Sequence, residues 1–128
     1  DASEDQAVEL MLRGTSDGNT YYSGGIGPGG TDGNVIFFGR VVAGTFNAVG
    51  TSLSIADFTV GTTHDIEFRV SGSAAPVTLQ LYIDGVLAHS ATNSASPITA
   101  VGRPGIKASI ASTASTKRRF EDFEAGGL

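Results

Sequence analysis

The residues of this chain that could do chemistry are first of all its carboxylates. Glycoside hydrolysis needs two carboxylic groups that flank the scissile bond, and the closest grouping is Glu121, Asp122 and Glu124. Glu121 and Glu124 are three residues apart, which places their side chains on opposite faces of a regular strand. Asp65 and Glu67 share a face, but no third carboxylate follows them on that segment. The spacing therefore predicts no hydrolase.

Nucleophilic catalysis has equally little to build on. The chain has two histidines and no cysteine. His64 falls in a predicted turn and His89 at the end of a predicted hairpin, and neither is near a nucleophile on a sharp turn. Two widely separated histidines without cysteine also give no zinc-ligand spacing. We therefore expect no catalytic residues, and we expect the protein not to be an enzyme.

Calcium is the one metal with candidate ligands. Asp17 and Asn19 flank a glycine, as do Asp32 and Asn34, and these side chains carry the oxygen atoms that Ca²⁺ prefers. The same tripeptides are also ordinary turn sequences, because Asp and Asn side chains bond to their own backbone. The sequence leaves both interpretations open and indicates no other cofactor.

A sugar site would need an aromatic surface with hydrogen-bonding side chains nearby. Tryptophan is absent, and the three tyrosines are Tyr21, Tyr22 and Tyr82. Tyr82 is predicted on the polar face of its strand, together with Gln80 and Arg69. Its ring could instead cover apolar neighbours at a sheet edge or an interface. These five residues are the candidate ligand-binding set.

The charge balance excludes some partners. The formal net charge is −5, and the one basic cluster, at 117–119, is followed at once by the acidic residues of 121–124. Because binding to phosphate needs a basic face, we expect no nucleic acid partner. No apolar run approaches the roughly 20 residues of a membrane span, so we expect no membrane insertion, and no signal peptide is recognisable.

Strands are the elements that must position these residues. Ile66, Phe68 and Val70 alternate with polar residues, and so do the apolar residues of 77–83, which is typical of half-buried antiparallel strands. Asp84 and Gly85 then supply a tight primed turn, and 86–89 returns as the hairpin partner. Two strands and a hairpin turn predict a β-sheet protein.

The rest of the chain follows the same pattern. We expect one domain over 1–128, all-β, as a β-sandwich or jelly roll of about nine short strands. Because the chain begins with Asp1 and not Met, we expect a processed product or a piece of a longer polypeptide. A closing strand at 118–123 carries Phe120 and Phe123 as candidate core residues. The other expected strands are 8–14, 20–26, 35–42, 44–49, 53–58 and one that follows a Pro-Gly turn at 104–105.

Four segments in this order carry a family resemblance: HDIEFRVSG from His64, VTLQLYIDGVLAHS from Val77, GRPGIKAS from Gly102 and RRFEDFEAGGL from Arg118. The chain resembles the concanavalin A-like lectin/glucanase superfamily. Within it, the chain looks closest to the laminin-G-like modules of secreted bacterial proteins and of tailed-phage virion proteins. The resemblance implies an antiparallel jelly-roll β-sandwich of two sheets.

Members of this superfamily are sugar-binding modules, adhesion modules, glucanases or structural domains, so the fold alone does not choose among them. We expect a non-catalytic structural or adhesion module at the virion surface of a bacteriophage, as a capsid decoration or tail-associated protein. Its partners would be other virion proteins or copies of itself in a homo-oligomer, with Phe37 or Phe38 at the contacts. The alternative is an extracellular carbohydrate-binding module of a secreted bacterial enzyme or adhesin, whose partner is a glycan.

Overall fold

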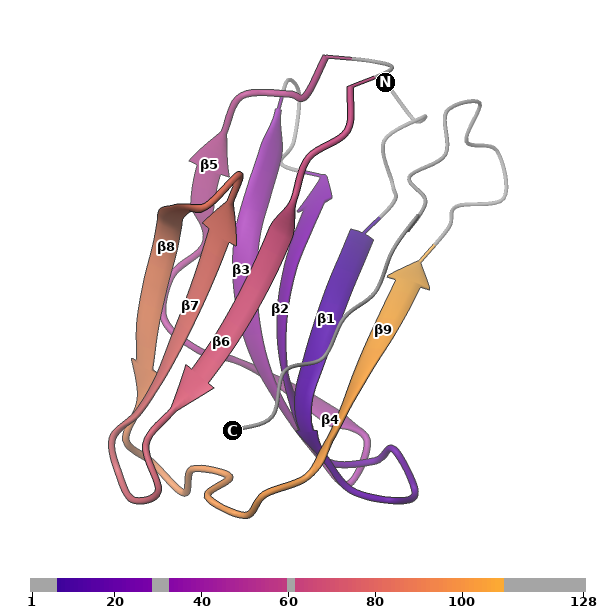
Figure 1. Cartoon of the computed structure of the whole chain (residues 1–128). Helices are drawn as coiled ribbons and strands as arrows, with labels where there is room; N and C mark the ends of the chain where they lie inside the picture. Colours follow the sequence, from indigo (N-terminus) through magenta and orange to yellow (C-terminus); the bar gives the residue numbers. More distant parts are fainter. Residues whose placement is uncertain (1–6, 29–32, 60–61, 110–128) are drawn as a thin grey trace.

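The computed structural model describes residues 7–28, 33–59 and 62–109, and in these ranges the chain forms β-strands and no helix (Figure 1). The predicted all-β class is confirmed. The described part of the chain therefore has no helix long and apolar enough to cross a membrane. The strands are β1 (Ala7–Gly14), β2 (Tyr21–Pro28), β3 (Asn34–Val42), β4 (Thr45–Ala48), β5 (Leu53–Ile55), β6 (Ile66–Ser71), β7 (Val77–Ile83), β8 (Val86–Asn93) and β9 (Arg103–Ser109).

The strands form two antiparallel sheets that stack on each other (Figure 1). The larger sheet has six strands in the order β4-β3-β2-β1-β9, with β5 also paired to β3. The smaller sheet has the order β6-β7-β8. In Figure 1 the smaller sheet lies in front of the larger one, and the apolar core lies between them. This arrangement is consistent with the predicted β-sandwich.

The alternation in β6 and β7 positions their side chains as the sequence predicts. Phe68 and Val70 point into the core from β6, whereas Glu67 and Arg69 between them are exposed. In β7, Leu81 and its apolar neighbours two and four residues earlier are fully buried. Burying such a side chain stabilises the fold by about 1.5–3 kcal/mol, so these two strands supply much of the core.

The apolar run of β3 reflects its place inside the larger sheet. β3 pairs with β2 on one edge and with both β4 and β5 on the other. Ile36 and Phe38 face the core and are 0 % and 2 % exposed, and Phe37 is half-buried on the outer face. The expectation that Phe38 lies at a contact with another subunit is therefore wrong, because its ring stacks on Phe68 inside the sandwich.

Two turn predictions had different outcomes. Asp84 and Gly85 have φ values of 51° and 79°, which confirms the primed turn between β7 and β8. Pro104 and Gly105, in contrast, lie within β9 and form no turn. Among the described residues β9 pairs only with β1, and a strand without a second neighbour tolerates a proline because one side of it needs no N–H donor. The predicted closing strand at 118–123 lies outside the described residues.

Glycines in the larger sheet lie against large side chains. A Cβ atom added at Gly25 would be 2.7 Å from the Phe37 ring, and one added at Gly39 would be 2.1 Å from the ring of Phe46, which is 51 % exposed. On the inner face, a Cβ atom at Gly24 would be 2.5 Å from the buried Phe68 ring. These glycines let aromatic rings approach the sheet backbone closely.

Candidate functional site

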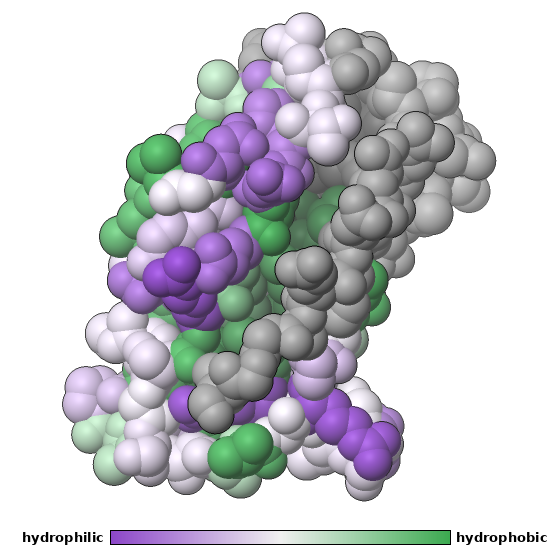
Figure 2. Space-filling view, viewed as in Figure 1, coloured by the Kyte–Doolittle hydropathy of each residue, from purple (hydrophilic) through white to green (hydrophobic). Residues whose placement is uncertain are grey.

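The outer face of the smaller sheet brings together three of the five candidate ligand-binding residues. In the register of β6 with β7, Glu67 lies opposite Tyr82 and Arg69 lies opposite Gln80. All four side chains point away from the core, because their apolar neighbours fill the inner face. We call these four residues the β6–β7 polar face. Figure 2 looks onto this side and shows hydrophilic residues gathered over β6 and β7.

Interactions within the β6–β7 polar face hold its side chains in one arrangement. The guanidinium carbon of Arg69 lies 4.2 Å from the centre of the Tyr82 ring, which is the geometry of a cation–π contact. Arg69 also donates two hydrogen bonds to Glu67, from Nε at 2.5 Å and from Nη2 at 3.2 Å. These bonds lower the pKa of the Glu67 carboxyl and raise the pKa of Arg69. Both groups therefore stay charged near neutral pH.

Tyr21 and Tyr22 lie elsewhere. Tyr21 is on the larger sheet, largely buried, and lines a hollow of about 170 Å³ with Thr15 and Arg103. Tyr22 is 0 % exposed, so no ligand can reach its ring in this structure. Adjacent residues of a strand point to opposite faces, and therefore the two tyrosines cannot form one aromatic surface.

The Tyr22 hydroxyl stabilises the fold through two hydrogen bonds. It donates a hydrogen bond to Oδ1 of Asn93 at 2.7 Å and accepts one from the backbone N–H of Ile98 at 2.9 Å. Burial raises the pKa of Tyr22, so the hydroxyl keeps the proton that it donates. The bonds attach the loop between β8 and β9 to the larger sheet.

Two arginines attach the same loop. Arg40 of β3 donates from Nη1 to the carbonyl oxygen of Ala95 at 3.0 Å. Arg13 of β1 donates from Nη1 to the carbonyl oxygen of Ile98 and from Nη2 to that of Gly72, both at 2.7 Å. Side chains of three adjacent strands therefore hold the loop that leads from the smaller sheet back to the larger one.

The candidate calcium ligands do not come together. Asp17 and Asn19 lie in the turn before β2, whereas Asn34 begins β3, at the other end of β2. Asp17 accepts hydrogen bonds from the Thr15 hydroxyl and the Asn19 backbone, and these bonds lower the pKa of Asp17. Asn34 is buried and donates to Asp57 at 2.8 Å. Asp32 lies outside the described residues, and among those that are described no three acidic or histidine side chains cluster as a metal site would require.

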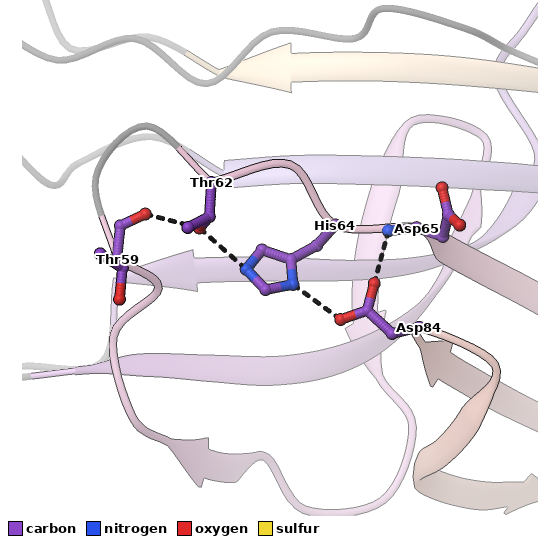
Figure 3. A network of polar contacts seen from close by, with 5 residues as sticks. All are labelled: Thr59, Thr62, His64, Asp65 and Asp84. Carbon is purple, nitrogen blue, oxygen red and sulfur yellow. Dashed lines mark hydrogen bonds and ion pairs between the residues drawn. The ribbon is translucent and has the colours of Figure 1, made fainter.

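A network around His64 was not predicted from the sequence (Figure 3). Its Nδ1 lies 2.8 Å from Oδ2 of Asp84, and its Nε2 lies 3.0 Å from the Thr62 hydroxyl. The other carboxylate oxygen of Asp84 accepts the backbone N–H of Asp65 at 2.9 Å. The His64 ring stacks on Phe58, with 4.4 Å between the ring centres. We call this set the His64 clasp.

The His64 clasp has the hydroxyl, imidazole and carboxylate order of a catalytic triad. However, the Thr62 hydroxyl oxygen is also 2.6 Å from the carbonyl oxygen of Thr59, which can only accept. The single hydroxyl proton therefore goes to Thr59, and His64 cannot take it as a general base. The clasp instead fastens the segment before β6 to the β7–β8 turn.

The sequence held a signal for the His64 clasp. The predicted β6 and β7 strands are antiparallel neighbours, so the residue before one must lie near the residue after the other. This places Asp65 beside Asp84, and the backbone N–H of Asp84 donates to the carbonyl oxygen of Asp65 at 2.8 Å. His89, the second histidine, stacks on Phe38 with 5.4 Å between the ring centres and bonds to the carbonyl oxygen of Thr51.

Comparison of the chain with protein-family models, curated proteins and solved structures gives no match. The candidate site therefore rests on the geometry of the chain itself.

Proposed function

We propose that this protein is a non-catalytic structural or adhesion module and that the β6–β7 polar face is its docking surface. The observation that carries the proposal is the contact of Arg69 with the Tyr82 ring on an exposed sheet face. Tyrosine and arginine are enriched among the residues that dominate binding at protein interfaces. Here both are already ordered before a partner arrives, which lowers the entropy cost of binding.

The finer architecture belongs to the same proposal. We infer a concanavalin A-like jelly roll of the laminin-G-like type, because the four motifs of the resemblance follow one another in order. The two stacked antiparallel sheets support this inference. The setting that the resemblance favours is the surface of a phage virion, where the partner would be another virion protein or a second copy of the chain.

A carbohydrate-binding module is the second candidate. The observation in its favour is that Gln80, Glu67 and Arg69 share the outer face of β6 and β7 with Tyr82. A sugar on this face would meet hydrogen-bonding groups beside an aromatic residue, and a few placed polar groups next to an aromatic surface orient a bound ligand. The setting would then be extracellular.

The native mass of the purified protein, measured beside a glycan array, tests both candidates. A defined oligomer that dissociates when Tyr82 is changed to Ala supports the structural or adhesion module. A monomer that binds a specific glycan, and loses it in Tyr82→Ala, supports the carbohydrate-binding module in its place.

Phe46→Ala is the matched control, because Phe46 is an exposed aromatic residue of the other sheet. It should leave both oligomer and glycan binding intact. An oligomer that survives Tyr82→Ala but is lost in Phe46→Ala would overturn the docking surface proposed here.

A further inference from the structure

Arg13 is a buried cation with no carboxylate partner in the part of the chain that the structure describes. It is 8 % exposed, and no carboxylate oxygen in the described part of the chain lies within 4.0 Å of its guanidinium. It donates hydrogen bonds to the carbonyl oxygens of Gly72 and Ile98. Carbonyl groups satisfy N–H donors but do not neutralise a positive charge, and buried charges in proteins are usually paired with an opposite charge.

One N–H of Arg13 is open to solvent. A guanidinium has five N–H donors, and Arg13 uses two of them in its bonds to Gly72 and Ile98, so the other three, including Nε–H, have no partner among the described residues. In the same residues, the one sealed side-chain polar atom without a hydrogen bond is Oγ of Ser23. The Nε atom of Arg13 therefore keeps some surface in contact with solvent.

Arg13 lines a hollow of about 320 Å³ at one end of the sandwich. This volume is at the lower end of the range for small-molecule sites. Val70 and Val101 form apolar walls, and Ser71, Ser73 and Thr99 add hydroxyl groups. In Figure 1 this end is the lower one, where β1 and β6 end and β9 begins.

The backbone of β1 turns Arg13 toward this hollow. Regular alternation would place Arg13 on the outer face of the larger sheet with Met11. Arg13 has a φ of 57°, and the register between β1 and β9 shifts between Met11 and Gly14. A non-glycine residue in the left-handed region of φ is uncommon and costs about 1–3 kcal/mol. The strained backbone at Arg13 therefore accompanies the placement of its positive charge at the hollow.

We propose that the hollow binds a small organic carboxylate, which pairs with Arg13 and rests its apolar part against Val70 and Val101. A single positive charge between apolar walls suits a monoanion with an apolar tail better than an inorganic dianion. The carboxylate could belong to a free short-chain acid or to an acidic sugar. This inference is independent of the β6–β7 polar face and survives if that docking surface fails its test.

An NMR titration of the full chain with sodium butyrate tests the proposal. The Arg13 Nε–H signal and the Val70 and Val101 methyl signals should shift together and saturate, with a Kd on the order of 1–10 mM for so small a ligand. Butyramide has the same shape without the charge and should cause no saturable shift. Glucuronate in a parallel titration distinguishes a free short-chain acid from an acidic sugar. A lower Kd for glucuronate than for butyrate would assign the site to acidic sugars.

Substitutions at exposed valines avoid the risk of unfolding. Val101 is 85 % exposed, so Val101→Ser should leave the fold intact and weaken butyrate binding about threefold to tenfold. Val86 is 69 % exposed and lies in the β7–β8 hairpin at the far end, so Val86→Ser should leave binding unchanged. Equal shifts with butyramide, no saturation up to about 0.1 M butyrate, or unchanged binding in Val101→Ser would each overturn the proposal.

Discussion

At the scale of single residues, the same side-chain type has different tasks according to the face it occupies. Tyr22 is sealed in the core and orders a loop through its hydroxyl, whereas Tyr82 faces solvent beneath a guanidinium. The face of Tyr82 follows from the regular alternation around it. The Tyr21–Tyr22 pair has no such alternation, since glycines follow it, and its orientation could not be predicted from the sequence.

Asp84 gives a pH prediction at the residue scale. The hydrogen bond with His64 is the main cause that lowers the Asp84 pKa, followed by the bond from the Asp65 backbone. The folded chain therefore favours the carboxylate more than the unfolded chain does. This contribution to stability is complete above the unfolded pKa of about 3.9 and is lost as the pH falls through the lower folded value.

We expect the wild-type protein to lose more stability than Asp84→Asn between about pH 5 and pH 2. Asparagine tolerates the positive φ of this turn position, so the turn should remain. Urea unfolding at several pH values measures the difference between the two proteins. Identical pH dependence of their unfolding free energies would contradict the contribution of the His64 clasp.

At the scale of elements, two of the glycine contacts of the larger sheet predict losses of stability of different size for the same substitution, glycine to alanine. Gly24→Ala places a methyl group 2.5 Å from the buried Phe68 ring and should destabilise the protein by about 1–3 kcal/mol. Gly39→Ala meets the Phe46 ring, which is exposed and free to rotate away, so the change in stability should be below about 1 kcal/mol. Thermal unfolding of both variants measures their stabilities. Equal losses of stability would contradict the prediction, because the backbone effect of replacing glycine would then outweigh the ring contacts.

Most strands could be predicted from the sequence, because their apolar residues alternate and their turns have characteristic residues. Pro104 and Gly105 show why the rest could not. Their dipeptide is typical of a turn, and it fits inside β9 because that strand has β1 as its single partner within the described ranges. Edge position depends on how all the strands pair. The hollow at Arg13 could not be predicted for the same reason. It forms from a residue with a left-handed backbone conformation and from two loops that are distant in the sequence.

At the scale of the whole molecule, the two sheets are held together by a shared core. Leu81 is fully buried within it, and Leu81→Ala should cost about 2–5 kcal/mol. Gln80 is its neighbour on the outer face, and Gln80→Ala should change stability by less than about 0.5 kcal/mol. Chemical denaturation measures both values. A small loss for Leu81→Ala would mean that the core collapses around the deleted side chain.

The pairing of β1 has a consequence for biosynthesis. β1 has β2 as a local neighbour, but its second partner is β9, where Leu10 lies opposite Ile106. At about 5–20 residues per second, a ribosome needs roughly 5–20 seconds to make the chain between them. Through that time β1 is an open edge on a nascent chain, the state in which strands join the wrong neighbour. A chaperone that covers β1 during translation should therefore raise the yield of folded protein more than one added after release.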